Sequence, residues 1–278
     1  MSSILYYITG HGFGHAVRSS QVIRSLRKLE PELTVHVRST VPHWLFPQSV
    51  IHSRQVLDAG VVQSDCLEMD LDETLRICQS LHEQAPGLIE EELRFIETEK
   101  PGLIVGDIPP LCFEIAARAG IPSVAVANFT WDAIYRAYVN ERPGFLPLID
   151  AMERFYANAT LALALPYPYG LTVFPHCESI PWISRLSALT KQEARVKFGL
   201  PKDATIVLLS FGGLGLRRLS LEELSESKEF FFLSTGDNEK RFGNLAILPD
   251  LQHKYQDLVR AADVLVSKPG YGIVTDSL

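Results

Sequence analysis

The chain has 278 residues, of which 46% are hydrophobic and 21% are charged, and it carries a net charge of −7. This length suits about two domains of an ordinary globular protein. The acidic balance argues against a general nucleic-acid binder, which normally carries an excess of Lys and Arg, so no nucleic-acid partner is expected. No apolar run approaches the ~18–20 residues that span a bilayer, although peripheral membrane contact stays open.

The cysteines indicate a reducing compartment. Cys66, Cys78, Cys112 and Cys177 show neither a C-x-x-C motif nor a metal-ligand spacing, and no signal peptide is recognisable. Free thiols are typical of cytosolic proteins. We therefore expect a cytoplasmic location and no metal site.

The N-terminus predicts a strand, a glycine-rich turn and a helix in succession. Residues 4–8 are apolar, and residues 10–15 read Gly-His-Gly-Phe-Gly-His. One face of the following helix is apolar and consists of Val17, Val22, Ile23, Leu26 and Leu29. Glycines without a Cβ atom let a ligand approach the backbone, here at Gly12 and Gly14, and the helix start adds partial positive charge. The turn therefore predicts a binding site, with His15 as a candidate catalytic base.

The next elements are expected at residues 33–38 (strand), 42–46 (short helix) and 51–57 (strand). Two helices are then expected, over residues 70–84 and 87–99. Pro86 and Gly87 lie between them, and this pair normally interrupts helical hydrogen bonding.

A strand–helix–strand unit follows. Residues 103–107 have the apolar character of a buried strand and end in a carboxylate, and residues 122–127 predict the next strand after a helix. Short apolar strands that alternate with helices indicate an α/β fold with a parallel, doubly wound sheet. Ligands bind such sheets at the carboxyl ends of the strands. Residues 9–15, Asp107 and residues 128–132 all fall at such ends, which predicts one shared site.

The second half of the chain repeats this alternation. Residues 161–165 predict the last strand of a first domain, 1–165, and the Pro- and aromatic-rich segment 166–184 predicts a linker. A second domain, 185–278, is expected to contain strands at 205–209, 230–233, 245–248 and 263–266 and helices at 188–198, 255–262 and after residue 272. Two of its strands run into glycine-rich turns, at 210–215 and 267–272.

Two Rossmann-like halves with these turns resemble the GT-B fold glycosyltransferases. The Gly-rich/His loop at residues 10–15 and the glycine loop at 210–215 are similar to the loops that open the two domains of this family. Residues 248–276 are similar to its donor-binding signature and are the most specific part of the match. The chain resembles most the MurG-like UDP-sugar transferases and the glycosyltransferase-like domain that precedes the sugar kinase in plant arabinokinases.

The resemblance implies a transferase that holds a nucleoside-diphosphate sugar, by family default a UDP-sugar, mainly in the second domain. The acceptor is held mainly by the first domain, and transfer to its hydroxyl proceeds with inversion, without an essential metal or cofactor. The chain ends at Leu278, inside the first helix after the donor signature, whereas family members normally continue. We therefore expect the second domain to be incomplete at its C-terminus.

The first domain contains the expected catalytic residues. Glycosyl transfer needs a base for the acceptor hydroxyl, and histidine titrates near neutral pH, which makes His15 the candidate base. Asp107 is expected to orient His15 or to bind acceptor hydroxyls. On the acceptor side, together with the glycine turn, Asn128 and Asp132 are candidates for sugar hydroxyls, and Trp131 is a candidate to stack on a sugar ring.

The second domain contains the expected donor-binding residues, which are Gly212, Gly213, Gly215, Lys268, Gly270 and Asp276. The leaving nucleoside diphosphate develops negative charge that preorganised N–H groups and a lysine stabilise. Asp276 stands where the family usually has a glutamate that binds the ribose hydroxyls, so its reach is shorter.

Three other interpretations stay open. The chain could be a non-catalytic sugar-nucleotide-binding module of a larger protein. A nicotinamide-dependent oxidoreductase would use Arg38 for a 2′-phosphate, although the first loop lacks the third glycine of G-x-G-x-x-G. A metal site of His11 and His15 has the right i, i+4 spacing, but no HExxH carboxylate accompanies it.

The acceptor is the least determined part of the prediction. A small molecule or a lipid-linked molecule is compatible with the sequence. Trp44-Leu45-Phe46, with Arg18, Arg24 and Arg27 near it in sequence, could meet a lipid-linked or anionic acceptor, although core packing explains this segment as well.

Overall fold

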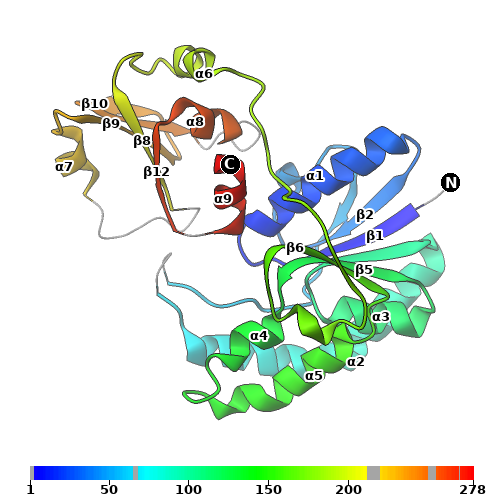
Figure 1. Cartoon of the computed structure of the whole chain (residues 1–278). Helices are drawn as coiled ribbons and strands as arrows, with labels where there is room; N and C mark the ends of the chain where they lie inside the picture. The colour runs from blue at the N-terminus through cyan, green and yellow to red at the C-terminus, as the bar shows by residue number, and fades with distance from the viewer. Residues whose placement is uncertain (1–2, 65–67, 212–219, 250–254, 269) are drawn as a thin grey trace. The chain divides into compact units, whose positions relative to one another are not determined.

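The structure is a computed structural model that describes residues 3–64, 68–211, 220–249, 255–268 and 270–278. The chain divides into two compact units (Figure 1). Unit 1 comprises residues 1–62 and 69–183, and unit 2 comprises residues 63–68 and 184–278. Each unit is built around its own sheet.

Unit 1 has a seven-stranded parallel sheet in the order β3-β2-β1-β4-β5-β6-β7. Its strands are β1 (Ser3–Ile8), β2 (Thr34–Arg38), β3 (Ile51–Ser53), β4 (Leu103–Asp107), β5 (Ser123–Phe129), β6 (Leu161–Tyr169) and β7 (Cys177–Ser179). The strand order reverses between β1 and β4. This is the point of a doubly wound sheet at which the loops on either side diverge and ligands bind.

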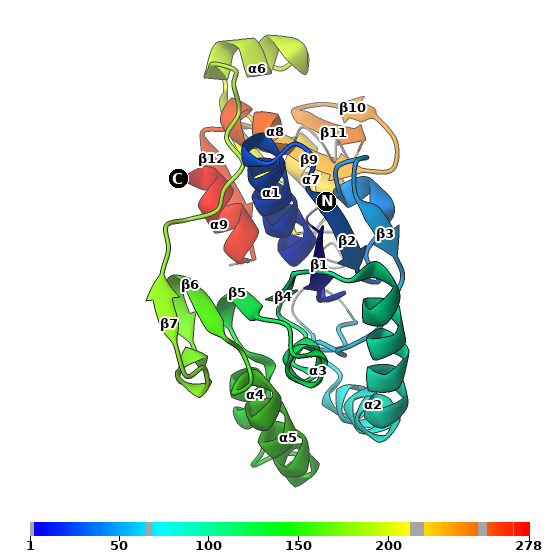
Figure 2. The same ribbon diagram turned by 90° about the vertical axis from the view of Figure 1, so that its right-hand side faces the viewer.

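The helices of unit 1 cover both faces of this sheet. They are α1 (Gly14–Leu29), α2 (Leu71–Glu99), α3 (Leu111–Ala119), α4 (Trp131–Arg136) and α5 (Leu146–Tyr156), with 3-10 turns η1 (His43–Leu45), η2 (Pro143–Phe145) and η3 (Leu171–Val173). Helix α1 lies on one face, and α2, α3 and α5 lie on the other (Figures 1 and 2). Because helices cover both faces of the sheet, the side chains of β1 and β4 are apolar on both sides.

The predicted break at Pro86 is wrong, because α2 is one continuous helix over Leu71–Glu99. Asp70 caps it by accepting a hydrogen bond from the Glu73 N–H at 2.9 Å. Its buried residues recur at helical spacing on both sides of the proline and include Cys78, Ala85, Ile89 and Ile96. Burial of this continuous apolar face outweighs the one hydrogen bond that a proline removes.

The segment predicted as a linker, residues 166–184, belongs largely to unit 1. Strand β6 continues to Tyr169, η3 follows, and β7 adds an edge strand to the sheet. Pro166 and Pro168 lie in the last part of β6, after Ala162–Ala164, the residues that pair with β7, so they take no ladder hydrogen bond from that pairing. The observed boundary between the units, at Ile183 and Ser184, is close to the predicted end of the linker.

Unit 2 has a five-stranded sheet in the order β10-β11-β9-β8-β12. Its elements are β8 (Thr205–Ser210), β9 (Phe230–Gly236), β10 (Lys240–Phe242), β11 (Leu245–Pro249), β12 (Val264–Ser267), α6 (Lys191–Lys197), α7 (Leu221–Ser225), α8 (Tyr255–Ala261) and α9 (Tyr271–Ser277). All pairs are parallel except β10 with β11. Each unit thus has the Rossmann-like α/β arrangement that the sequence predicts.

Candidate functional site

The centre of the site is a contact between His15 and Asp107, 92 positions apart in the chain. His15 stands at the start of α1, directly after the turn that follows β1, and Asp107 is the last residue of β4. The sheet brings them together because β1 and β4 are parallel neighbours, with Ile8 opposite Asp107. His15 Nδ1 lies 2.7 Å from Asp107 Oδ1. Both are predicted site residues because they lie at strand ends, and they meet at the point where the strand order reverses.

Arg18 is the third member of this cluster. Its side chain and that of Asp107 are both buried. Its Nε donates to Asp107 Oδ2 at 2.7 Å, and its Nη2 donates to Asp107 Oδ1 at 2.5 Å. Ser19 Oγ also donates to Oδ2, at 2.9 Å. Asp107 is thus held by three side chains of α1, which fixes the carboxylate relative to His15.

These contacts select the tautomer of His15. A carboxylate only accepts hydrogen bonds, so Nδ1 must carry the proton that it donates to Asp107. Arg18 Nη2 also lies 3.1 Å from His15 Nδ1, but an N–H cannot donate to a protonated nitrogen, so we assign this as a close contact. Nε2 is then the nitrogen left to accept a proton.

Asp107 stays ionised in this environment. Burial alone would raise the pKa of its carboxyl, but the charge of Arg18 and the hydrogen bonds from Arg18 and His15 hold that pKa well below its usual range. The carboxylate is therefore a permanent negative charge beside the imidazole ring.

Asn128 is linked to the same cluster. It is half-buried at the end of β5, and its Oδ1 accepts a hydrogen bond from Arg18 Nη1 at 2.6 Å. Its predicted contact with sugar hydroxyls stays a prediction, and the structure adds a link to Asp107 through Arg18. His15, Asp107 and Asn128 are thus the predicted residues that the fold brings together.

The turn before His15 exposes its backbone. Gly12 has a φ of 69°, in the left-handed region that favours glycine. Gly12 and Gly14 are both exposed, and nothing lies within 4 Å of the position that a Cβ would take at either residue. The turn has the space that close approach of a ligand requires.

Trp131 was a candidate to stack on a sugar ring, with core packing as the alternative, and its buried side chain favours core packing. One face stacks on Tyr135 with ring centroids 6.0 Å apart, and the ring lies 6.5 Å from that of His15. Its Nε1 donates to Asp58 Oδ2 at 2.8 Å. The Trp131 ring thus packs beside the His15 ring, and its burial leaves no face free to contact a sugar.

Asp58 is a charged residue near the site that the sequence did not indicate. Asp58 directly follows the strand predicted at residues 51–57, but no motif marks it, β3 ends at Ser53, and only the fold brings Asp58 to Trp131. Burial raises the pKa of its carboxyl, although hydrogen bonds from Thr9 and Trp131 act in the opposite direction. Asp58 therefore holds the Trp131 side chain in place by accepting its Nε1 hydrogen bond.

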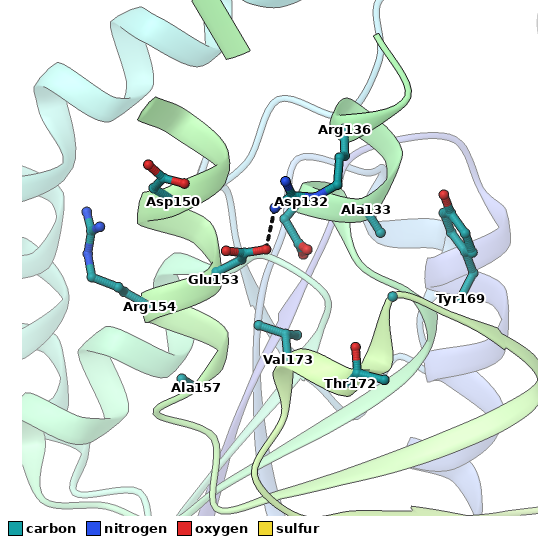
Figure 3. A pocket seen from close by; sticks show the side chains of 11 residues that line it. Asp132, Ala133, Arg136, Asp150, Glu153, Arg154, Ala157, Tyr169, Thr172 and Val173 are labelled. Carbon is teal, nitrogen blue, oxygen red and sulfur yellow. Dashed lines mark hydrogen bonds and ion pairs between the residues drawn. The ribbon is translucent and has the colours of Figure 1, made fainter. Parts of the chain in front are cut away.

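Asp132, the remaining acceptor-side candidate, faces a different space. It lines a pocket with residues of α5 and η3 (Figure 3). None of the residues that line this pocket belongs to the cluster of His15, Arg18 and Asp107.

The segment suggested for a lipid-linked or anionic acceptor is mostly core. Leu45 and Phe46 are buried, and so is Arg18, which is paired with Asp107. Trp44 packs edge-on against Phe13, with centroids 5.6 Å apart. The structure therefore supports the core interpretation of this segment.

Arg38 does not support a dinucleotide phosphate site. It is buried at the end of β2, where Nε donates to Glu92 Oε2 at 3.0 Å and Nη2 donates to Glu92 Oε1. Tyr7 Oη also donates to Glu92, at 2.6 Å. The guanidinium is thus committed to a buried ion pair between the sheet and α2, which removes the residue on which the oxidoreductase interpretation depended.

The donor-side residues of unit 2 are only partly described. Gly212, Gly213 and Gly215 lie outside the described residues. Gly270 directly precedes α9, and Lys268 follows β12. Asp276, in α9, is buried and accepts hydrogen bonds from the Arg185 backbone N–H at 2.8 Å and from Arg185 Nε at 2.9 Å and Nη2 at 2.5 Å. Its carboxylate already has a cationic partner, and a contact with ribose stays a prediction.

Replacing Asp276 by asparagine should destabilise unit 2 by about 2 kcal/mol, because it removes charged hydrogen bonds to a largely buried arginine. The measurement is the free energy of unfolding in urea. The matched control is Glu239→Gln, which breaks the exposed ion pair with Arg241 and should cost no more than about 1 kcal/mol. Equal losses in the two variants would show that Asp276 contributes nothing beyond a surface pair.

Among the described residues, no group of three or more His, Cys, Asp or Glu side chains is placed to hold a metal ion. His11 Nδ1 accepts a hydrogen bond from the Val61 N–H at 3.3 Å, and His15 Nδ1 is bound to Asp107. In the parts of the chain that the structure covers, no helix has the length and apolar character needed to cross a membrane.

Comparison with known proteins agrees with this architecture. Residues 2–166 match the family described as glycosyl transferase family 1. L-arabinokinase from Arabidopsis thaliana is 30% identical over 286 aligned residues, which cover 98% of this chain and 27% of that protein. The chain thus spans little more than a quarter of the length of this curated relative.

Solved structures show the same fold. Arabidopsis thaliana UGT89C1 complexed with UDP-L-rhamnose has a TM-score of 0.61 at 15% identity, with 99% of this chain and 76% of that chain covered. A ugt transferase from Siraitia grosvenorii in complex with UDP has a TM-score of 0.55 at 14% identity, with 100% and 79% covered. At these identities the similarity establishes the fold alone. The predicted GT-B α/β fold is therefore confirmed.

The parallel α/β unit with His15 and Asp107 at its strand-order reversal and the second Rossmann-like unit have the architecture of the GT-B fold. The chain belongs to glycosyl transferase family 1.

Proposed function

We propose that the chain transfers a sugar from a UDP-sugar to a hydroxyl group of an acceptor, with inversion and without a metal ion. Unit 2 holds the nucleotide and unit 1 holds the acceptor. Support for UDP comes from two of the similar structures, which are complexes with UDP-L-rhamnose and UDP. Within the family we propose a MurG-like subgroup, on the Gly-rich/His loop at residues 10–15.

The observation that carries this proposal is the oriented base. His15 Nδ1 is tied to Asp107 at 2.7 Å, which leaves Nε2 to take the proton of the acceptor hydroxyl. The acceptor oxygen then forms a bond to the anomeric carbon while the bond from that carbon to the diphosphate oxygen breaks. Attack from the face opposite the leaving group inverts the configuration. Asp107 stabilises the imidazolium that forms, as a fixed carboxylate does in other His–Asp pairs.

The leaving UDP gains negative charge, which the donor side has to stabilise. Lys268 supplies a positive charge, and the N–H groups of Gly212, Gly213, Gly215 and Gly270 are the proposed hydrogen-bond donors. The acceptor side is proposed to include Gly12, Gly14 and Asn128. It accepts a small molecule or a lipid-linked one.

We also propose a cytoplasmic location. Cys78, Cys112 and Cys177 are free thiols, and the first two are buried. Reduced cysteines of this kind are typical of cytosolic proteins.

The test is a thermal-shift panel of UDP, GDP, TDP, ADP, NAD and NADP, followed by an assay of UDP release from UDP-glucose, UDP-galactose, UDP-arabinose and UDP-rhamnose. UDP at 100 times its Kd should stabilise the chain by about 2.7 kcal/mol. A dinucleotide alone giving the shift, or no nucleotide giving one, would refute the donor assignment. UDP binding without sugar transfer to water or to any offered acceptor would leave a non-catalytic sugar-nucleotide module.

A further inference from the structure

A second carboxylate, Asp58, belongs to the surroundings of His15 and has no role in the transfer step described above. It lies in the segment between β3 and α2, whereas Asp107 comes from β4. Its Oδ2 accepts the Nε1 hydrogen bond of Trp131 at 2.8 Å, and the ring of Trp131 lies 6.5 Å from that of His15. One buried aromatic side chain thus connects this carboxylate to the candidate base.

Two aromatic rings restrict the position of the His15 imidazole. Phe129, at the end of β5, lies edge-on to it with ring centroids 5.5 Å apart, and the Trp131 ring is tilted by 35° to it. Trp131 also packs against Tyr135 and Phe129, with ring centroids 6.0 and 5.1 Å apart. An indole has a single N–H group, and Trp131 donates it to Asp58. The orientation of the Trp131 ring beside His15 therefore depends on Asp58.

The contacts of Asp58 favour its ionised form. Three donors hold the carboxyl, namely the indole N–H of Trp131, the Thr9 hydroxyl and the Gly10 backbone N–H. Burial raises the pKa of this carboxyl, and these hydrogen bonds act in the opposite direction. Asp58 is thus a negative charge in a fixed position.

The charges around His15 leave a need for a second carboxylate. Arg18 donates two hydrogen bonds to Asp107, so these two side chains are neutral as a pair. When His15 takes up a proton, the three side chains together carry one positive charge in a buried place, where an unbalanced charge is costly. The negative charge of Asp58 balances it.

The other titratable side chains around Asp58 are uncharged near neutral pH. Burial raises the pKa values of four thiol and phenol groups, which belong to Cys78, Cys112, Tyr135 and Tyr156. His11, whose ring lies 5.2 Å from that of Trp131, accepts the Val61 N–H at Nδ1, which only a neutral imidazole does. In the described part of the chain, Arg18, Asp107 and Asp58 therefore carry the charges that face His15.

Asp58 and His15 are also coupled through their charges. Burial raises the pKa of Asp58, and the positive charge of a protonated His15 acts to lower it. Coupling between two sites is reciprocal, so the charge of Asp58 favours the protonated form of His15 by the same free energy.

We propose that Asp58 is a positioning residue for His15, which holds Trp131 against the imidazole ring and balances the charge of the imidazolium ion. The proton moves from the acceptor hydroxyl to His15 Nε2, and Asp58 neither gives nor takes one. The inference rests on the proposed sugar transfer for its effect on rate, whereas the titration of His15 tests it without that reaction.

The experiment is an NMR titration of the imidazole signals of the whole chain, with His15 identified by the signal that His15→Ala lacks. Asp58→Asn keeps an oxygen that accepts from Trp131 Nε1 but removes the charge, so His15 should titrate at a pH lower by about 0.5 units or more. The matched control is Asp150→Asn, the same chemical change at an exposed residue of α5, which should shift this titration by less than about 0.1 units. An unshifted titration in Asp58→Asn, or equal shifts in the two variants, overturns the proposal.

A measurement on the wild type keeps the test decisive if Asp58→Asn lowers the melting temperature. The carboxyl carbon signal of Asp58 should change in a separate step at the pH where His15 titrates, because the two charges are coupled. This step should be absent from His15→Ala and from the carboxyl signal of Asp150. A wild-type Asp58 signal without the step contradicts the proposal.

The transfer assay separates this inference from the proposed function. Asp58→Asn should lower kcat about three- to tenfold and leave KM for the UDP-sugar within about twofold, because the weakened group acts on the base and not on the nucleotide. The acid limb of its pH profile should move to lower pH. If the wild type transfers no sugar but His15 titrates as expected, the proposed function fails and this inference stands. If the wild type transfers sugar and Asp58→Asn leaves the titration unchanged, this inference alone fails.

Discussion

Replacing Asp107 by asparagine is expected to lower the free energy of unfolding of unit 1 by about 3–5 kcal/mol, because it leaves a buried arginine without a negative partner. Arg18 donates two hydrogen bonds to this carboxylate, and the Asp107 side chain is fully buried. Asparagine keeps the shape and one acceptor oxygen but removes the charge. The measurement is urea unfolding followed by tryptophan fluorescence, because Trp44, Trp131 and Trp182 all lie in unit 1.

Two controls separate this ion pair from general damage to the core. The double variant Arg18→Met/Asp107→Leu replaces the pair by apolar groups, so it should be closer to wild-type stability than Asp107→Asn. A double variant that loses at least as much as the single one would contradict the assignment.

The pH dependence provides a second control. The pKa of Asp107 is lowered in the folded state, so its contribution is fully present above the unfolded value of about 4 and is lost as the pH falls further. The stability difference between wild type and Asp107→Asn should therefore shrink below pH about 4.

The position of His15 and Asp107 could be predicted because it follows from topology. Strands of a doubly wound sheet end at one edge, so residues after successive strands meet there whatever the side-chain details. Hydrophobic runs located β1, β4 and β5, and with them the glycine turn, Asp107 and Asn128. The same reasoning could not show that β1 and β4 are direct neighbours, which sets the 2.7 Å contact.

The role of Arg18 could not be predicted, because an arginine on an amphipathic helix normally faces solvent. It lies one turn after His15 on the same side of α1, so both reach Asp107. Only the presence of a carboxylate 89 positions away makes its burial favourable. For Trp131 the sequence left sugar stacking and core packing as alternatives, and only the fold shows that the side chain is buried.

The pocket around Asp132 was out of reach of the sequence for a different reason. Helices α4 and α5 were not predicted, since their short apolar segments carry turn-forming residues between them. Without these helices, no pocket around Asp132 could be expected, so Asp132 was grouped with Asn128 on the acceptor side. Helix α2 shows that tertiary burial also overrides local rules, because Pro86 stands inside it.

Replacing His15 by alanine is expected to reduce the rate of sugar transfer by about 10²–10⁴-fold, the usual effect of losing a general base. UDP binding should be nearly unchanged, because the nucleotide is proposed to bind in unit 2. Arg18 and Ser19 continue to hold Asp107 in this variant, so unit 1 should stay folded. The measurements are kcat for UDP release and the UDP-induced thermal shift, both on the same preparation.

The pH profile distinguishes a base from a packing residue. A base must be unprotonated to act, so the wild-type kcat/KM should fall on the acid side as the imidazole becomes protonated, and His15→Ala should lose this limb. His43→Ala is the matched control, since His43 is exposed on η1 and should keep both the rate and the profile. If His15→Ala keeps its turnover, another group is the base. If turnover and UDP affinity fall together, His15 maintains the structure and does not act as the base.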